Sequence, residues 1–257
     1  MNVHVAERRK RVGSRLLDRA VAAAREAGRR SVIAQADAGT PGDRFLAASG
    51  FRKVLTLIHA RPALDEMDRS RIDRISAVVE LPHHGYRLAS WRGTVPGELA
   101  KTFADSRRAM DDMPMSDTDY GVVVWDVDRV LAAAQAVADR GDLLTTVVAV
   151  DDSDGTIVGF SELVVPGDGR GDGQHYGTGV LPEHRGHDLG RWMKAEMLRL
   201  ARINHPELSG VVTDTADNNV HMRHINDALG YMPTHRALQY QLDPAAPGPT
   251  PSVRRSR

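Results

Sequence analysis

The chain has 257 residues, of which 41% are hydrophobic and 26% charged, with 34 basic and 34 acidic side chains. This composition is typical of a folded globular protein and excludes a collagen-like, coiled-coil or wholly disordered chain. The sequence contains no cysteine, which excludes disulfides, thiolate metal ligands and a cysteine nucleophile. No apolar run approaches the ~18 residues of a membrane span, and the start MNVHVAERRKR lacks the apolar core of a signal peptide. We therefore expect a cytoplasmic protein of about two domains that has no membrane partner.

Hydrophobic spacing predicts a mixed α/β chain. Apolar residues recur at helical spacing between residues 8 and 30, and Gly28 follows the last of them. Further predicted elements of the first part are a strand at 31–37, a helix at 41–49 and a strand at 51–58. The second part is predicted to contain a strand at 86–92, helices at about 96–113 and 127–140, strands at 144–150 and 156–165, a Gly-rich loop at 167–173 and a strand ending near Leu181.

Two segments of the chain repeat each other. The matched positions, which share one constant offset, are Arg8 and Arg185, Gly13 and Gly190, and Leu17 and Lys194. AASGF at 47–51 corresponds to DALGY at 227–231, at a slightly longer offset. Both copies run from a basic loop through an amphipathic helix, a strand and a second helix to a Gly-aromatic pair and a strand.

The repeat predicts how the chain is organised. We expect a partial N-terminal copy at 1–61, a linker at 62–85 and a complete copy at 86–242. The Pro-rich segment 243–257 is expected to be a disordered tail. The first copy is expected to act as structure, by covering the second copy or the partner chain of a homodimer.

A polar loop in the second copy is the candidate binding motif. Residues 180–192, VLPEHRGHDLGRW, place this loop between a strand end and a helix start. Unpaired backbone N–H groups and the helix dipole favour phosphate oxygens there. Taken alone, the Arg-Gly-x-x-x-Gly pattern fits a plain strand-to-helix turn equally well.

The loop resembles the acyl-CoA signature of the Gcn5-related N-acetyltransferases (GNAT), (Gln/Arg)-x-x-Gly-x-(Gly/Ala), preceded by a Val-x-Pro strand end. Asp188 stands where that signature has its first Gly. The resemblance continues through Asn219 and the LGY triplet at 229–231. It implies a mixed, mostly antiparallel central sheet flanked by helices, in a tandem plan similar to that of the mycothiol synthase type, whose substrate is not carried over.

The resemblance also implies acetyl-CoA as cosubstrate, a small-molecule primary amine as acceptor, and no metal. The residues expected to bind acetyl-CoA are Val180, Leu181, Arg185, Gly186, His187, Asp188, Leu189, Gly190, Arg191, Asn219 and Asn226. In this family two strands splay apart, so that backbone groups near Val180 pair with the pantetheine arm and an N–H polarises the thioester carbonyl. The amine attacks directly, so no covalent nucleophile is required.

Glu162 is the candidate general base. Strand alternation places it on one face with Val158, Phe160 and Val164, which is unusual for a carboxylate unless it is paired or used. Partial burial would raise its pKa. A structural salt bridge explains Glu162 equally well, and His175 is the next candidate.

The other polar groups point less clearly to chemistry. Asn226 occupies the position where the family often has a Tyr that acts as the general acid. Either Tyr231 or water therefore protonates the departing thiolate, or CoA leaves as the thiolate, and core packing is the simpler role for Tyr231. The spacing of three between His184 and His187, and between His221 and His224, does not form a zinc motif. Asp111 and Asp112 could attract a cationic amine, or they could simply belong to a solvated loop.

Two alternative functions remain at this stage. A non-catalytic acyl-CoA-binding or scaffold protein is favoured by Asp188 and Asn226. A nucleic-acid-binding module is suggested by nine Lys/Arg against three acids in residues 7–30. The neutral total charge and the lack of interleaved aromatic residues argue for a solvated helix face, so we expect no nucleic-acid partner.

Overall fold

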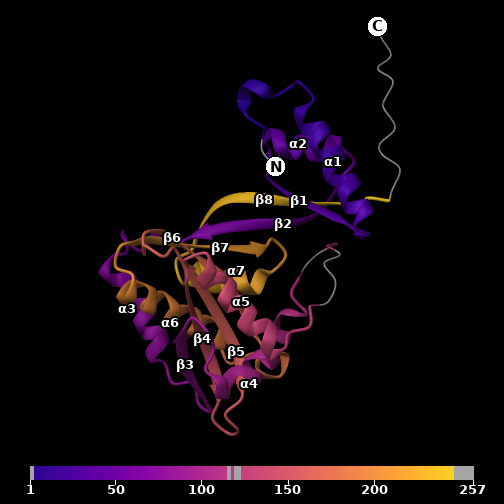
Figure 1. Cartoon of the computed structure of the whole chain (residues 1–257). Helices are drawn as coiled ribbons and strands as arrows, with labels where there is room; N and C mark the ends of the chain where they lie inside the picture. Colours follow the sequence, from indigo (N-terminus) through magenta and orange to yellow (C-terminus); the bar gives the residue numbers. More distant parts are fainter. Residues whose placement is uncertain (1–2, 115–116, 119–122, 246–257) are drawn as a thin grey trace. The chain divides into compact units, whose positions relative to one another are not determined.

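The computed structural model describes residues 3–114, 117–118 and 123–245 (Figure 1). The chain forms two compact units. Unit 1 consists of Met1–Leu57, Met115–Tyr120 and His235–Arg257, and unit 2 of Ile58–Pro114 and Gly121–Thr234. Residues 246–257, most of the tail that we expected to be disordered, lie outside the described residues.

Unit 2 is built on a mixed sheet with the strand order β7-β6-β5-β4-β3. Its strands are β3 (Tyr86–Arg92), β4 (Leu143–Asp151), β5 (Ile157–Val165), β6 (Gly171–Val180) and β7 (Leu208–Ala216). Neighbouring strands are antiparallel except β6 and β7, which are parallel. All nine residues of β5 are buried, because helices cover both faces of the sheet at this point.

Alternation along β5 separates the two helical layers. A Cβ on Gly159 would lie 2.9 Å from the Cε atom of Met193 in α6 (Leu189–Asn204), so α6 covers this face. The next residue, Phe160, meets Phe103 of α4 (Ala100–Ser106) with ring centroids 6.0 Å apart, so α4 covers the opposite face. The latter face also receives α5 (Val127–Asp139), whose inner residues pack on Leu144 and Val164.

The helix predicted at 96–113 is divided into three parts. A 3-10 turn at Gly97–Leu99 precedes α4, and a second at Arg107–Met110 follows it. The tighter second turn carries Arg107, which is buried against the sheet although its residue type prefers solvent.

The prediction that residues 62–85 form only a linker is wrong. They contain α3 (Arg69–Glu80), which begins at Asp68, whose carboxylate accepts a hydrogen bond from the N–H of Arg71 at 2.7 Å. Ile75 is buried in the core of unit 2, and the indole N–H of Trp192 in α6 donates to the carbonyl of Val79 at 3.0 Å. The apolar face of α3 is thus part of the same core as α6.

Unit 1 contains α1 (Val12–Glu26), β1 (Val32–Asp37), α2 (Pro41–Ala48) and most of β2 (Arg52–Arg61) and β8 (Met232–Leu242). β1 and β8 are antiparallel, in register from Val32 opposite Leu242 to Asp37 opposite Ala237. Leu46, Phe51 and Tyr240 form its small buried cluster. The helix predicted at 8–30 is shorter than expected, and a 3-10 turn at Val5–Glu7 precedes it.

Each unit includes backbone from the other repeat. In unit 1, β1 of the first copy pairs with β8, the last strand of the second copy. In unit 2, the segment after β2 of the first copy runs along β7, where the N–H of Leu64 donates to the carbonyl of Ser209 at 2.8 Å. The two copies therefore exchange their terminal strand segments.

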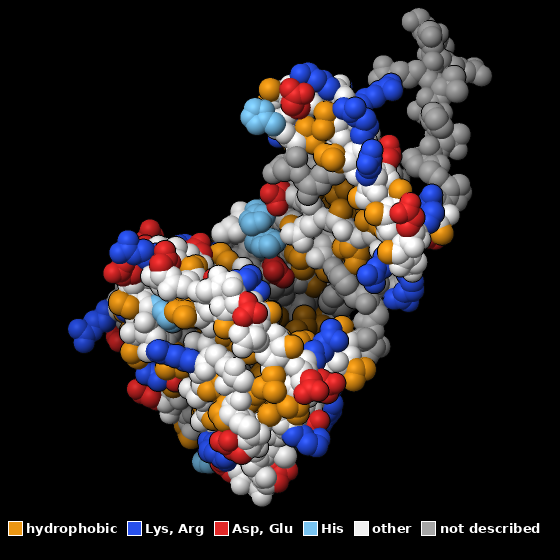
Figure 2. All heavy atoms as spheres, in the orientation of Figure 1, with side chains coloured by type: hydrophobic (Ala, Val, Ile, Leu, Met, Phe, Trp, Pro, Cys, Tyr) orange, Lys and Arg blue, Asp and Glu red, His pale blue; other side chains and the backbone are white. Residues whose placement is uncertain are grey.

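Charges of both signs are interspersed over the face shown in Figure 2, as expected for a chain of zero formal net charge. Within the residues that the structure describes, no helix is long and apolar enough to cross a membrane.

Candidate active site

The two parallel strands of unit 2 separate along their length. β6 and β7 pair from Gly171 to Gln174 on one strand and from Leu208 to Val212 on the other. The remainder of β6, from His175 to Val180, has no register partner on β7 among the described residues. This splay leaves backbone groups on the β7 side of β6 open to a ligand that pairs like an added strand.

A loop rich in N–H groups follows the open end of β6. A 3-10 turn at Pro182–His184 leads to Gly186, whose φ of +87° is in the left-handed region that favours glycine. The first hydrogen bond of α6 runs from the N–H of Trp192 to the carbonyl of Asp188. The N–H groups of Leu189, Gly190 and Arg191 therefore have no acceptor within the helix, and they lie at its positive end. This arrangement suits the oxygens of a diphosphate.

Asp188, which replaces the first Gly of the family signature, adopts a left-handed conformation with φ of 59°. Its carboxylate forms an ion pair with Arg191 at 2.5 Å. This pairing offsets the negative charge next to the N–H groups, so Asp188 is compatible with an anion at the start of α6.

Arg185 is held in place by protein groups. Its Nε donates to the carbonyl of Val180 at 3.0 Å, and its terminal nitrogens donate to Asp112 at 2.6 and 2.8 Å. The Arg185 guanidinium lowers the pKa of Asp112, which is therefore an ion-pair partner rather than a free attractor for an amine. The N–H of Leu181 donates to the carbonyl of Val158 on β5, so it is not available to a ligand.

The same loop geometry occurs in the first copy. Arg11, which the repeat matches to Asp188, has φ of 61°, and Arg9 has φ of 67° where the second copy has Gly186. The Nε of Arg8 donates to the carbonyl of Val3 at 3.4 Å, the counterpart of the bond from Arg185 to Val180. The sequence repeat is therefore also a repeat of backbone conformation and side-chain contact.

Tyr86 joins the site although the sequence contained no signal for it. Its hydroxyl lies 3.0 Å from Nδ1 of His184, and its ring is 5.3 Å from that of His187. Strand β3 therefore packs on the loop, and neither of these histidines belongs to a group that could hold a metal ion among the described residues.

The two asparagines named from the sequence lie on α7 (Val220–Ala228) or cap it. Asn219 caps the helix, and its Oδ1 accepts a hydrogen bond from the N–H of Met222 at 3.1 Å. Asn226 is buried, and its Nδ2 donates to the hydroxyl of Thr215 on β7 at 3.1 Å. Oδ1 of Asn226 is buried without a hydrogen-bond partner among the described residues. An unpaired acceptor beside the splayed part of β7 fits an amide N–H of a pantetheine arm.

Glu162 lies on β5 as predicted, but its carboxylate is not free. Both of its oxygens accept hydrogen bonds from the guanidinium of Arg107 at 2.8 Å, and both side chains are 9% exposed. The guanidinium also lies 4.4 to 4.8 Å from the ring centroids of three aromatic residues, namely Phe103, Trp125 and Phe160. The structure therefore places Glu162 in a buried ion pair, and its role as a base stays a prediction. Because Arg107 is distant from Glu162 along the sequence, no local pattern revealed the pair.

His175, the next candidate base, is enclosed by protein. Its Nε2 lies 2.6 Å from the hydroxyl of Ser161 and its Nδ1 lies 3.1 Å from that of Tyr231. Burial, with the nearby Lys194 cation, lowers the pKa of His175 well below its usual value. Lys194 itself is 1% exposed, and burial lowers its pKa to about 7. The sequence did contain a signal for this buried amine, because Lys194 occupies one of the core positions of α6, but the signal was not used in the sequence analysis.

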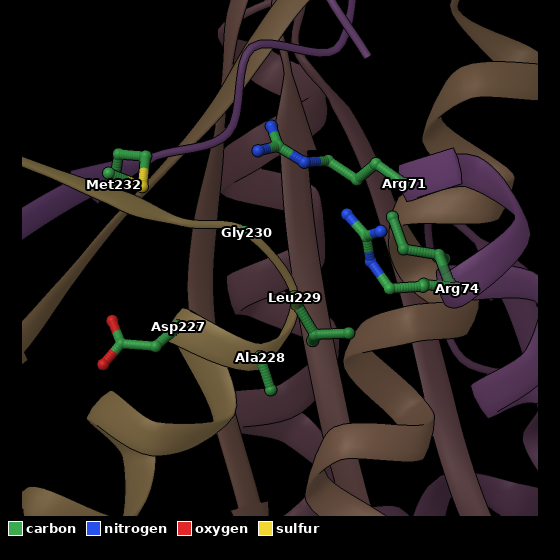
Figure 3. A pocket seen from close by; sticks show the side chains of 8 residues that line it. Arg71, Arg74, Asp227, Ala228, Leu229, Gly230 and Met232 are labelled. Atoms are coloured by element: carbon green, nitrogen blue, oxygen red, sulfur yellow. The ribbon is translucent and has the colours of Figure 1, made fainter. Parts of the chain in front are cut away.

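A separate cavity of about 200 Å³ lies where α3 meets the end of α7 (Figure 3). Arg71 and Arg74 extend over the Leu229–Gly230 turn, where cations interact favourably with the negative end of the helix dipole. Its lining shares no residue with the splay of β6 and β7 or with the loop at 182–188.

Comparison with known proteins agrees with this geometry. Residues 107–231 match the model of the Acetyltransferase (GNAT) family. A search of curated proteins finds no match. The fold is similar to that of a tandem GNAT protein from the clavulanic acid biosynthesis pathway, with 24% identity, a TM-score of 0.75, and 96% of this chain and 74% of that chain covered.

Two further solved structures show the same fold. A GCN5-related N-acetyltransferase from Sphaerobacter thermophilus is 17% identical with a TM-score of 0.66, covering 94% of this chain and 71% of that chain. One from Kribbella flavida is 18% identical with a TM-score of 0.56, covering 90% and 74%. The fold is thus the mixed, mostly antiparallel α/β fold expected from the sequence. Residues 107–231 belong to the GNAT family of acetyltransferases.

Proposed function

We propose that this protein transfers an acetyl group from acetyl-CoA to a primary amine of a small molecule, by direct attack of the amine on the thioester. One arrangement carries the proposal: the splay of β6 and β7 opens towards the N–H groups at the start of α6, beside the unpaired Oδ1 of Asn226. An added strand, a diphosphate and an amide N–H each find a complementary group there.

The proposed roles follow from these contacts. The N–H groups of Leu189, Gly190 and Arg191 hold the diphosphate, and Asn226 accepts from the pantetheine arm. Acetyl-CoA supplies the thioester carbonyl. Glu162 is the proposed base for the acceptor amine, which requires that its pair with Arg107 open when substrate is present.

Binding of acetyl-CoA is expected to raise the melting temperature of the wild-type chain, by an amount that grows with the logarithm of one plus the ratio of the free acetyl-CoA concentration to Kd. Gly190→Glu should abolish this shift, because it adds a negative charge at the start of α6, where the diphosphate is proposed to bind. The added Cβ itself would make only an ordinary contact with Cδ1 of Ile225, at 3.5 Å. The matched control is Gly13→Glu at the equivalent position of the first copy, which should keep the shift.

Melting curves without ligand separate lost binding from lost folding, and Asn226→Leu supplies a second variant that should weaken binding. A full shift in folded Gly190→Glu would contradict the proposed position of acetyl-CoA.

Calorimetry should find one acetyl-CoA per chain, since the first copy is proposed to act as structure. Two equivalent sites would overturn that role.

The alternative, a non-catalytic acyl-CoA-binding protein, is favoured by the engagement of both Glu162 oxygens with Arg107. Thioester turnover measured with a panel of small amines distinguishes the two functions. Acetyl-CoA binding without turnover of any amine would support the alternative.

A further inference from the structure

Four buried polar side chains form a hydrogen-bonded series that ends at the splay. The series begins at Tyr231, in the segment after α7, and continues through His175 on β6 and Ser161 on β5 to Thr178 on β6. The successive distances are 3.1 Å from Tyr231 Oη to His175 Nδ1, 2.6 Å from His175 Nε2 to Ser161 Oγ, and 2.7 Å from Ser161 Oγ to Thr178 Oγ1. None of the four is more than 9% exposed.

Burial and the hydroxyl partners favour a neutral imidazole in this series. Burial is the largest cause that lowers the pKa of His175, and the nearby Lys194 acts in the same direction. Its hydrogen-bond partners are hydroxyl groups and include no carboxylate among the described residues. A neutral imidazole has one N–H, so one ring nitrogen donates and the other accepts.

Tyr231 decides which nitrogen carries the proton. Its hydroxyl is buried, and His175 Nδ1 is its hydrogen-bond partner among the described residues. If Nδ1 carried the proton, the phenolic O–H would be a buried donor without an acceptor, which is costly. Tyr231 therefore donates to Nδ1, and the N–H at Nε2 donates to Ser161.

The same reasoning fixes the direction of the hydrogen bond between Ser161 and Thr178. Ser161 is fully buried and accepts from Nε2, so its own proton goes to Thr178 Oγ1. Thr178 Oγ1 also lies 3.3 Å from His175 Nε2, but that nitrogen carries its own proton, so the hydroxyl proton of Thr178 has no acceptor within the series. Thr178 is 9% exposed against 1% for Tyr231, so an unpaired donor costs less at Thr178, where a ligand or water can reach it. Thr178 lies in the part of β6 that no longer pairs with β7, so this donor is located at the splay.

We propose that the hydroxyl of Thr178 donates a hydrogen bond to the thioester carbonyl of acyl-CoA, and that Tyr231, His175 and Ser161 are positioning residues that set its direction. This inference rests on the proposed function. A donor oriented before the reaction stabilises the charge that grows on the carbonyl oxygen, since it needs no reorganisation during the attack.

Calorimetry with acetyl-CoA and with CoA tests the proposal, because CoA lacks the acyl carbonyl. Thr178→Val should weaken acetyl-CoA binding by about tenfold while leaving CoA binding unchanged. Thr178→Ser, which keeps the hydroxyl, should bind acetyl-CoA and CoA with the same ratio of affinities as the wild-type chain. Thr145→Val, a buried threonine on β4, is the matched control and should change neither affinity.

Two further measurements keep the test decisive if Thr178→Val does not fold. Nitrogen-15 NMR of the wild-type chain should show the proton of His175 on Nε2, and a proton on Nδ1 would overturn the proposed direction. Ser161→Ala should also reduce the preference for acetyl-CoA over CoA.

The two proposals fail in different ways. If wild-type protein binds neither acetyl-CoA nor CoA, the proposed function is wrong. If it binds both, and Thr178→Val retains the wild-type ratio of affinities, the role of Thr178 is wrong and the proposed function stands.

Discussion

Replacing Lys194 with Met is expected to raise the free energy of unfolding by about 3–5 kcal/mol below pH 7, and by almost nothing near pH 10.5. Lys194 is 1% exposed, and burial lowers its pKa from 10.5 to about 7 in the folded chain. Below pH 7 the amine is protonated in both states, so the cost of burying the charge is fully present. Between pH 7 and pH 10.5 the unfolded chain binds the extra proton, so the wild-type chain becomes more stable as pH rises.

Urea unfolding of both proteins between pH 6 and pH 10.5 measures this difference. Lys194 also lowers the pKa of His175, so the difference curve below about pH 7 contains both effects, and the change between pH 7 and pH 10.5 is the part that reports Lys194 alone. Lys101→Met, at an exposed lysine paired with Asp105, is the control and should change stability by less than about 0.5 kcal/mol. A difference between wild type and Lys194→Met that does not change with pH would show that Lys194 is not a buried titrating amine.

Glu162→Gln is expected to lower the free energy of unfolding by about 3–5 kcal/mol, because it leaves the buried guanidinium of Arg107 without its partner. Arg107→Gln should cost a similar amount for the reciprocal reason. The double variant removes both charges, so we expect it to recover most of the lost stability. Additive losses in the double variant would show that the two side chains do not form a coupled pair.

The double variant also tests the proposed base, because it removes the carboxylate without leaving an unpaired charge. If Glu162 accepts the proton of the amine, turnover should stay about 10²–10⁴ below wild type even where stability is recovered. Recovery of wild-type turnover would leave Glu162 as an ion-pair partner only.

Features that depend on a short-range pattern of residues could be predicted from the amino-acid sequence alone. Apolar spacing predicted strands at 144–150 and 156–165, close to β4 and β5, and the sequence repeat located two equivalent loops. Loop conformation is a local property, which is why Asp188 and Arg11, matched in sequence, share a left-handed backbone. The resemblance of residues 180–192 to the acyl-CoA signature of the family could be recognised for the same reason.

Tertiary structure decided everything that depends on distant partners. Glu162 looked available as a base because its guanidinium partner lies far away in the sequence, on a 3-10 turn. The apolar residues of 62–85 show only weak helical periodicity, so α3 was not predicted, and its burial depends on contact with α6. The exchange of terminal strand segments between the copies is likewise non-local, since backbone hydrogen bonds between strands carry no signature in a single segment. The direction of hydrogen-bond donation from Tyr231 to Thr178 depends on which buried donors have an acceptor. Those partners are brought together only in the folded chain.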